Sequence, residues 1–169
     1  MTTLVIRDEC KADFQAVREV NRAAFGRDDE ADLVDALRAG FHSRVSLIAS
    51  LDQEVVGHIM FTDLVIVTNG GDVKALALAP VAVAPEFQRR GIGSALVTKG
   101  LEVARSRGGQ IVVVVGHPEF YPRFGFSPEL AKRLRAPFSG PAFMAVELIP
   151  EAMKCVEGLV RYAPPFGIS

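Results

Sequence analysis

Residues 78–96 read LAPVAVAPEFQRRGIGSAL, and this stretch carries the strongest indication of the fold. A strand rich in Val and Ala ends near Ala84, a short loop follows, and a helix begins with Gly91 and Gly93 in its first turn. The first N–H groups of a helix have no intrahelical partners and, together with the helix dipole, attract anions. Glycine has no β-carbon to keep a phosphate away from the backbone, and Ser94 adds a hydroxyl donor. The stretch therefore predicts an anion site where the strand meets the helix.

The glycines of this loop do not identify the anion. A Walker loop would read GxxxxGK[ST], and this pattern is absent. A dinucleotide fingerprint would have a third small residue at position 96, where this chain has Leu96. A helix can also begin with glycines for packing reasons alone. Two common nucleotide loops are thus excluded, and a generic anion site and a structural turn are both left open.

The segments on either side of the loop predict a parallel crossover. A strand is expected from about Lys74 to Ala84, and helical spacing of apolar residues runs from Gly91 to Arg107. Residues 111–115 are Ile-Val-Val-Val-Val, a run typical of a strand that is buried on both faces in parallel pairing. Together these segments predict a right-handed βαβ unit. Because Pro80 cannot donate to a ladder, we expect the first strand to be interrupted or splayed there.

With the rest of the chain, the predicted fold class is α/β (α+β), built on a mixed sheet. Asp13 is a candidate N-cap, Gly40 a candidate C-cap, and Asn69-Gly70-Gly71-Asp72 a candidate hairpin turn. An antiparallel meander therefore precedes the crossover. No repeat or linker divides residues 1–169, which predicts a single domain, with 149–169 as a C-terminal extension whose structure the sequence leaves open. The remaining expected elements are strands at about 3–7, 46–51, 54–68 and 142–148, and helices at about 14–24 and 29–39.

The composition is that of an ordinary globular protein. Of 169 residues, 49% are hydrophobic and 23% are charged. Nineteen basic residues against twenty acidic ones give a net charge of −1, which argues against a nucleic-acid binder. No apolar run approaches the roughly 18 residues that span a bilayer, so no membrane association is expected. The one basic cluster, residues 132–135, is interpreted as a solvated loop, with a role in holding an anionic cofactor or substrate as the alternative.

Cysteine and histidine usage predicts a cytoplasmic protein without a metal site. Cys10 and Cys155 are too few for a disulfide framework and have no CxxC spacing, which favours a reducing cytosol. His42, His58 and His117 are scattered, without the spacing of metal ligands.

A second motif, GHPEFYPRFGF at residues 116–126, follows the predicted strand 111–115 directly. It can be interpreted as an aromatic corner that covers the sheet edge, with Tyr121 hydrogen-bonded into it. Its position favours a ligand site, because open α/β sheets bind ligands at the carboxyl ends of their strands. Tyr121 would then lie beside the strand that leads into the glycine loop.

The two motifs together resemble those of the GNAT superfamily of N-acetyltransferases. VxVxP (residues 81–85) followed by QxxGxG (residues 88–93) is similar to the family's pyrophosphate loop, and YxxxGF (residues 121–126) is similar to its tyrosine motif. The combination most resembles the YhbS-like branch of predicted acetyltransferases, over roughly residues 4–148. Many family members have an asparagine and a longer helix before the tyrosine, where this chain has the compact Gly-His-Pro of residues 116–118. Pantetheine contacts on that side are therefore left open.

The resemblance implies a GNAT-type acyl-CoA N-acyltransferase fold, splayed at the cofactor site, with acetyl-CoA or coenzyme A as the ligand. It implies that the backbone of Val81, Ala82 and Val83 hydrogen-bonds the pantetheine arm, and that an N–H of this stretch stabilises the oxyanion. Tyr121 would be the general acid that protonates the departing thiolate, because a tyrosine stays protonated at neutral pH. The residues implied to hold the pyrophosphate are Gln88, Arg89, Arg90, Gly91, Ile92, Gly93 and Ser94.

The implied reaction is direct transfer of the acetyl group to a primary amine of a small molecule or peptide. An acyl intermediate on Cys10 or Cys155 is disfavoured, since neither has an adjacent His or acidic partner. A CoA-binding sensor without turnover, and a transferase with a longer acyl-CoA or a hydroxyl acceptor, are the alternatives. The acceptor and the oligomeric state, a homodimer included, are left open. The candidates for the base, none of which is assigned, are Glu30, His58, Asp63, His117, Glu119 and a water chain.

Overall fold

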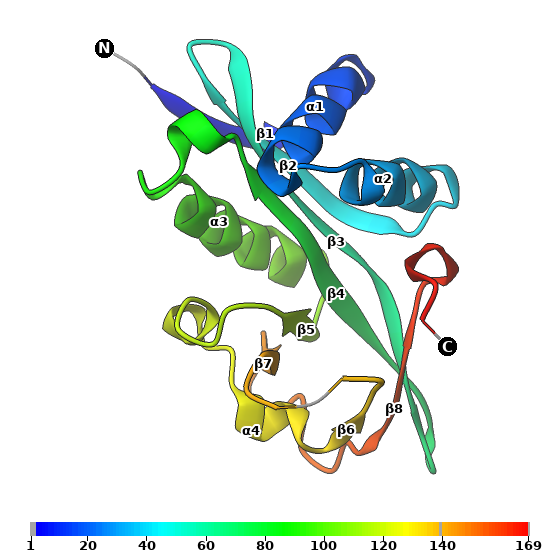
Figure 1. Cartoon of the computed structure of the whole chain (residues 1–169). Helices are drawn as coiled ribbons and strands as arrows, with labels where there is room; N and C mark the ends of the chain where they lie inside the picture. Colours follow the sequence, from blue (N-terminus) through cyan, green and yellow to red (C-terminus); the bar gives the residue numbers. More distant parts are fainter. Residues whose placement is uncertain (1–2, 139, 169) are drawn as a thin grey trace.

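The computed structural model describes residues 3–138 and 140–168, and its strands belong to one open sheet (Figure 1). Six strands lie in the order β1-β2-β3-β4-β5-β7, and β8 pairs with β3 and with the short β6. The strands are β1 (Leu4–Asp8), β2 (Ser43–Leu51), β3 (Glu54–Thr68), β4 (Gly71–Val83), β5 (Ile111–Val115), β6 (Leu134–Arg135), β7 (Phe143–Glu147) and β8 (Gly158–Tyr162). The helices are α1 (Phe14–Phe25), α2 (Asp29–Ala39), α3 (Ile92–Ser106) and α4 (Pro128–Ala131), with 3-10 turns η1 (Lys11–Asp13), η2 (Pro85–Phe87), η3 (Tyr121–Phe124) and η4 (Pro164–Phe166).

The predicted meander and crossover are both present. β1, β2, β3 and β4 pair in sequence and antiparallel, and the β3–β4 hairpin closes through the two-residue turn Asn69-Gly70. β5 lies parallel to β4 after the crossover through α3, and β7 returns antiparallel to β5. The mixed α/β fold class predicted around residues 78–96 is therefore confirmed.

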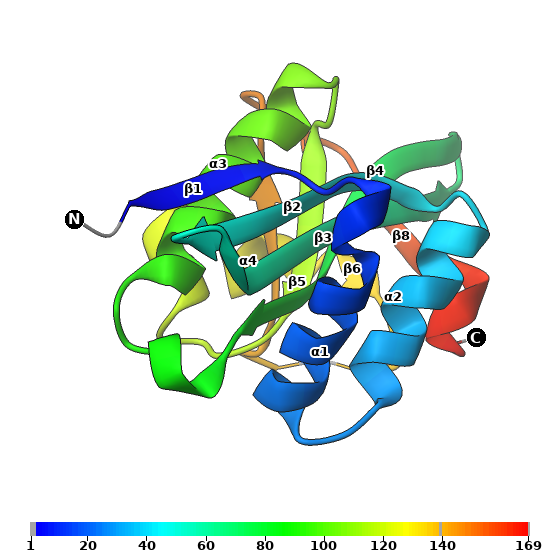
Figure 2. The same ribbon diagram turned by 90° about the horizontal axis from the view of Figure 1, so that it is seen from above.

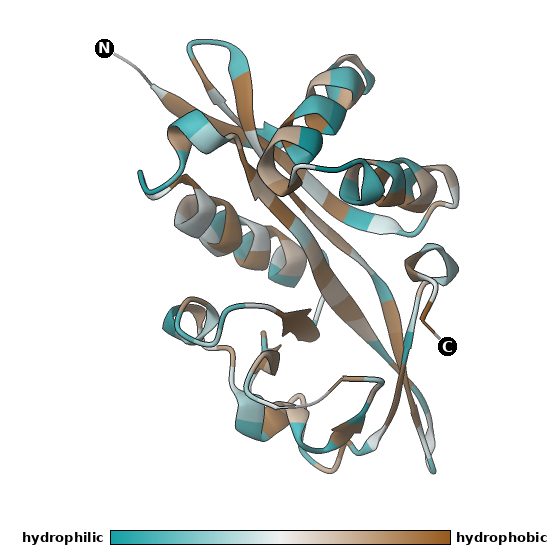
Figure 3. Cartoon of the chain, viewed as in Figure 1, coloured by the Kyte–Doolittle hydropathy of each residue, from teal (hydrophilic) through white to brown (hydrophobic). Residues whose placement is uncertain are grey.

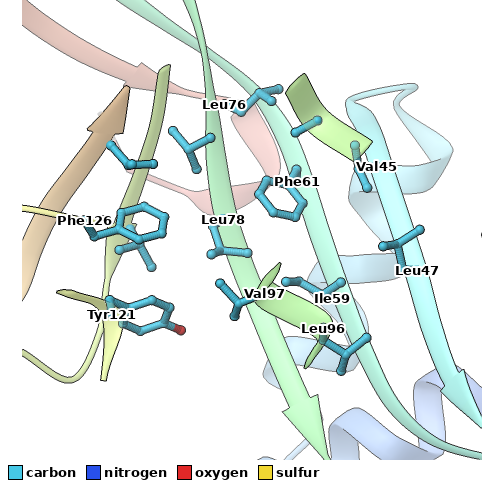
Figure 4. Close-up of a cluster of buried hydrophobic side chains, with 14 of the residues drawn as sticks. Val45, Leu47, Ile59, Phe61, Leu76, Leu78, Leu96, Val97, Tyr121 and Phe126 are labelled. Carbon is cyan, nitrogen blue, oxygen red and sulfur yellow. The ribbon is translucent and has the colours of Figure 1, made fainter. Parts of the chain in front are cut away.

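Helices cover both faces of this sheet (Figures 1 and 2). α1 and α2 lie on one face and α3 lies on the other. Under α3, Leu96 and Val97 pack with Ile59 and Phe61 of β3 in a buried apolar cluster (Figure 4). Apolar residues concentrate along the central strands, while polar residues recur on the outer sides of the helices (Figure 3). Within the described part of the chain, no helix is long and apolar enough to cross a membrane.

A β-bulge interrupts β4 around Pro80. Between the pairs Ile59–Val81 and Phe61–Leu78, β4 has one residue more than β3. An extra residue of this kind bends a strand and disrupts its ladder locally, and such a site tolerates a proline. The interruption expected from Pro80 is thus present.

The sheet also opens between β4 and β5. The two strands pair only at Leu76 and Ala77 of β4, opposite Val112 and Val113 of β5. Beyond Ala77, β4 continues to Val83 without a strand beside it on the β5 side. The splayed sheet implied by the family resemblance is therefore found in the pairing itself.

Asp13 occupies the predicted N-cap position of α1, but its side chain forms no capping hydrogen bond. Its carboxylate accepts the Cys10 N–H at 2.8 Å and pairs with Arg7 at 2.7 Å. The hydrogen bond from Arg7 holds the pKa of Asp13 well below its usual range. The carboxylate turns away from the helix because the guanidinium of Arg7 on β1 offers a charge-assisted partner.

The C-terminal segment that the sequence left open contains β8. This strand pairs antiparallel with residues 64–67 of β3, and its buried side chains, Val160 and Tyr162, join the core. Burial alternates along the strand, as expected for a strand with one face on the core. The five residues lie beside a proline-rich end, and this composition kept the strand from being placed from the sequence.

The basic cluster at residues 132–135 is engaged in local structure. Lys132 pairs with Glu129 at 2.8 Å, and Arg133 donates to the carbonyl of Met153 at 3.1 Å. β6 then lies beside β8, which flanks the part of β3 paired with the start of β4. The cluster is therefore at the opposite end of the sheet from the glycine loop, which follows the end of β4.

A buried polar cluster joins α1 to the sheet. His58 of β3 is fully buried, with Nδ1 at 3.3 Å from the side-chain nitrogen of Asn21 and Nε2 at 2.9 Å from Ser46 Oγ. The Asn21 side-chain nitrogen also donates to the Val17 carbonyl at 3.0 Å, which identifies it as the amide NH₂ group. In a neutral His58, Nδ1 then accepts from Asn21 and Nε2 donates to Ser46. Burial, with a smaller effect of the Arg38 charge, lowers the pKa of His58 to about 3. The neutral ring is thus part of the folded core.

Gly100 sets how closely α3 approaches the sheet. A β-carbon at this position would lie 2.5 Å from Phe61 Cε1 and 3.3 Å from Ile59 Cδ1. We expect Gly100→Ala to lower the free energy of unfolding by about 1–3 kcal/mol, because overpacking outweighs the gain of about 1 kcal/mol in helix propensity. Urea denaturation measures the change. Thr98→Ala, at an exposed position of α3, is the control. A Gly100→Ala protein of wild-type stability would contradict this close packing.

His58 should make the free energy of unfolding depend on pH. The unfolded chain binds a proton at His58 below about pH 6.5, whereas the folded protein resists protonation until about pH 3. Between these values the unfolded state holds more protons. The contribution of His58 to the free energy of unfolding is therefore complete above about pH 6.5. It is lost as the pH falls, by up to about 1.4 kcal/mol per pH unit.

Urea denaturation of the wild type and of His58→Gln from pH 4 to 8 measures this contribution. We expect a shallower pH dependence in His58→Gln, which cannot titrate. The same substitution at the exposed His117 controls for the loss of one histidine. Identical pH dependence in the wild type and His58→Gln would show that the buried ring does not resist protonation.

Candidate functional site

A cavity of about 360 Å³ lies where β4 leads into α3. One wall is the predicted loop and the first turn of α3, and the other is formed by Phe120, which precedes η3, and by Arg123 within η3. Of the seven loop residues named from sequence, all but Arg90 line it. The lining residues are Val83, Phe87, Gln88, Arg89, Gly91, Ile92, Gly93, Ser94, Phe120 and Arg123.

The backbone of the loop is shaped to present N–H groups to the cavity. Gly91 is the N-cap of α3 with φ of +83°, a left-handed conformation that favours glycine. Its carbonyl accepts the Ala95 N–H at 3.0 Å, which closes the first turn. The N–H groups of residues 92–94 precede this bond and have no acceptor within the helix. Ile92 is buried beneath the loop and contributes through its backbone.

Gly93 keeps the floor of the cavity open. A β-carbon here would lie 3.8 Å from Val83 Cγ2 and 3.9 Å from Phe120 Cζ, which are ordinary contacts. A β-carbon at this position would therefore fit the protein but occupy space beside the helix N–H groups. The two walls also approach each other here, because Phe120 reaches across to the first turn of α3.

The charge of the cavity is positive. Arg89 and Arg123 line it, and among the described residues no acidic side chain does. The guanidinium of Arg123 lies 5.1 Å from the centre of the Phe120 ring, and that of Arg90 lies 5.3 Å from the centre of the Phe87 ring. Helix N–H groups and unpaired arginines together suit an anionic ligand.

The unpaired edge of β4 presents backbone groups toward the splay. Ala84 N–H donates to the Val56 carbonyl at 2.8 Å, and hydrogen-bonded pairs alternate along an antiparallel ladder. Ala82 therefore directs its peptide groups to His58 on β3, while Val81 and Val83 direct theirs away from β3. The Gln88 side chain donates to the Val83 carbonyl at 2.9 Å. The groups left without a strand partner are the N–H and carbonyl of Val81 and the N–H of Val83.

Tyr121 lies on the other side of the splay. It is 9% exposed, and its ring packs against the backbone of Gly116, where a β-carbon would collide with it. Phe120 and Phe126 meet the ring edge-on, at 5.0 and 5.6 Å between ring centres. Its hydroxyl points toward β4 (Figure 4), and burial raises its pKa. The phenol is thus held as a protonated donor at neutral pH.

The five side chains considered as bases are spread over the molecule. Glu30 is paired with Arg27 at 2.6 Å, and Asp63 with Arg44 at 2.6 Å. His58 is buried under α1, and His117 and Glu119 are exposed in the loop before Tyr121. The geometry thus brings no one of them forward as the base.

Three residues that line the cavity were not predicted from the sequence: Phe87, Phe120 and Arg123. Phe120 and Arg123 lie within the GHPEFYPRFGF motif, and a basic residue two positions after Tyr121 was the available signal. Among residues 3–138 and 140–168, no group of three His, Cys, Asp or Glu side chains is placed to hold a metal ion.

Comparison with known proteins agrees with this geometry. Residues 5–128 match the family model of the acetyltransferase (GNAT) domain. The chain is 33% identical over 168 residues to the uncharacterized N-acetyltransferase YhbS of Escherichia coli (strain K12), covering 96% of this chain and 98% of YhbS. It is 42% identical over 120 residues to the uncharacterized N-acetyltransferase YjhQ of the same strain, covering 70% of this chain and 66% of YjhQ.

Solved structures give the same result. The crystal structure of YhbS from Escherichia coli in complex with CoA has a TM-score of 0.91 at 31% identity, covering 99% of this chain and 93% of that chain. A GNAT family acetyltransferase from Brucella melitensis in complex with acetyl-CoA has a TM-score of 0.82 at 32% identity, covering 97% and 98%. Similarity of this extent in both sequence and structure shows the family, and the chain belongs to the GNAT acetyltransferases, in the branch of YhbS, and is thereby an acyltransferase.

Proposed function

We propose that this protein transfers the acetyl group of acetyl-CoA directly to a primary amine of a small molecule or peptide. The observation that carries the proposal is the arrangement around the splay. An anion cavity lies at the end of β4, unpaired peptide groups run along β4, and the Tyr121 hydroxyl faces that strand from the other side. The CoA and acetyl-CoA complexes of the two related structures support the choice of donor.

The donor would bind along this path. Its diphosphate meets the N–H groups of residues 91–94, with Arg89 nearby. The pantetheine arm then runs along β4, where its amides take the N–H and carbonyl of Val81 and the N–H of Val83 as partners. Ala82 stays a predicted contact from the sequence; because its peptide groups face β3, the two valines supply the backbone partners proposed here.

The chemistry follows from this placement. The amine nitrogen attacks the thioester carbonyl, a C–N bond forms, and the C–S bond breaks. A backbone N–H at Val81 or Val83 is positioned to stabilise the oxyanion, and the thiolate takes its proton from Tyr121. The proton released by the amine leaves through a water chain or a side chain that is not assigned, and Tyr121 regains a proton from solvent before the next turnover.

The proposed setting is the cytoplasm. Cys10 and Cys155 are both exposed and form no disulfide, as expected for a protein in a reducing compartment.

Release of free thiol from acetyl-CoA, followed with a panel of primary amines, tests the proposed activity. We expect amine-dependent release with at least one acceptor class. Tight CoA binding without thiol release for any amine would instead identify a sensor. Faster release from propionyl-CoA or longer acyl-CoA would overturn the assignment of the acetyl group.

Gly93→Val should weaken CoA binding by at least about tenfold, because a branched side chain would fill the space beside the helix N–H groups. The smaller Gly93→Ala should lose less. Isothermal titration calorimetry with CoA measures both. The β-carbon meets only ordinary contacts, so Gly93→Ala should stay folded, and the unfolding midpoint of Gly93→Val checks the larger side chain. Wild-type affinity in a folded Gly93→Val protein would show that the diphosphate does not bind beside Gly93.

Tyr121→Phe should lower kcat by on the order of 10²–10⁴-fold and leave CoA affinity nearly unchanged, because only the proton donor is removed. Steady-state thiol release and calorimetry measure the two quantities. Tyr162→Phe is the matched control: Tyr162 is the other tyrosine of the chain, is also 9% exposed, and lies in β8 away from the cavity. Equal kcat in Tyr121→Phe and Tyr162→Phe would exclude Tyr121 as the rate-determining proton donor.

A further inference from the structure

We propose that Arg123 is a phosphate-binding residue that grips coenzyme A from the wall opposite the glycine loop. The inference rests on the proposed function, since it concerns the same cavity. It adds a side-chain contact from η3 to a cradle that otherwise consists of the loop and the start of α3.

The geometry fixes Arg123 at this wall. Its guanidinium stacks over the Phe120 ring at 5.1 Å. Phe120 itself is held edge-on by Phe124 at 5.1 Å and by Tyr121 at 5.0 Å, and its tip comes close to Gly93. Stacking restricts the position of the guanidinium plane and leaves its N–H edges free to donate. The aromatic cluster thus sets the width of the cavity and presents the charge to its interior.

Neither Arg123 nor Arg89 has a carboxylate partner among the described residues, and they are the two arginines that line the cavity. Five arginines away from the lining are also without an ion pair: Arg90, Arg105, Arg133, Arg135 and Arg161. Across residues 3–138 and 140–168, most arginines of the helices and meander have a carboxylate partner, whereas the two that line the cavity have none. The paired arginines are Arg7, Arg18, Arg22, Arg27, Arg38, Arg44 and Arg107. Within the part of the chain that the structure describes, the cavity lining also contains no acidic residue that could serve as a partner. Both guanidiniums are therefore free to pair with an anionic ligand in the cavity.

The chemistry of this counter-ion is that of a phosphate. The N–H groups of α3 can satisfy oxygens on one side of a diphosphate, and a group on the facing wall is needed for the rest. Arg forms two parallel hydrogen bonds to phosphate oxygens, which a single point charge does not. Coenzyme A offers both its diphosphate and its 3′-phosphate, and either fits the fork of Arg123.

The test measures Kd by calorimetry for CoA and for 3′-dephospho-CoA with the wild type, Arg123→Gln, Arg123→Lys and a control. Arg105→Gln is the control, because Arg105 is an exposed arginine in the last turn of α3, at the end of that helix away from the cavity. We expect Arg123→Gln to weaken CoA about 10- to 100-fold, Arg123→Lys to recover part of this loss, and Arg105→Gln to bind like the wild type. Unchanged unfolding midpoints confirm that the variants are folded.

The two ligands locate the phosphate. If Arg123 binds the 3′-phosphate, 3′-dephospho-CoA binds the wild type and Arg123→Gln equally. If it binds the diphosphate, Arg123→Gln weakens both ligands by the same factor. Either result supports the proposal. A change in CoA affinity below about twofold in Arg123→Gln, with normal wild-type binding, would overturn this inference and leave the proposed function intact. Absence of CoA binding to the wild type would overturn both.

Discussion

The peptide groups of β4 beyond Ala77 have no strand beside them on the β5 side, and the proposed chemistry depends on this constraint. Backbone donors and acceptors in a protein interior are almost always paired, so an open edge inside a sheet needs another partner. The bulge around Pro80 bends β4, and β5 ends at Val115 and turns into the loop that carries Tyr121. The separation of the parallel strands β4 and β5 therefore produces the opening and also places the Tyr121 phenol beside it.

The crossover helix turns this opening into a complete site. α3 must begin near the end of β4, because only eight residues, 84–91, connect them. Its close approach to the sheet at Gly100 fixes the helix axis, and the axis aims the N–H groups of the first turn at the cavity. Phe120 then bridges from the second motif to Gly93. Packing far from the cavity therefore determines the geometry of the proposed phosphate site.

Burial acts in opposite directions on two groups that flank β4. It lowers the pKa of His58 and raises that of Tyr121, since in each case the charged form loses its solvation. Both side chains are neutral at pH 7 as a result. His58 serves the attachment of α1, whereas the uncharged phenol of Tyr121 is the form that can donate a proton.

Local sequence already decided the elements and the loop. The sequence predicted three segments correctly: strand 54–68, the β-branched run 111–115 and the glycine loop. Hydrophobic periodicity, turn residues and positive φ depend on neighbouring residues, so a local pattern indicates them. Which peptide groups of Val81–Val83 face the splay, and that Arg123 faces the loop, followed only from the tertiary structure. Strand register and the facing of two motifs depend on contacts between residues distant in the chain, and no local pattern encodes them.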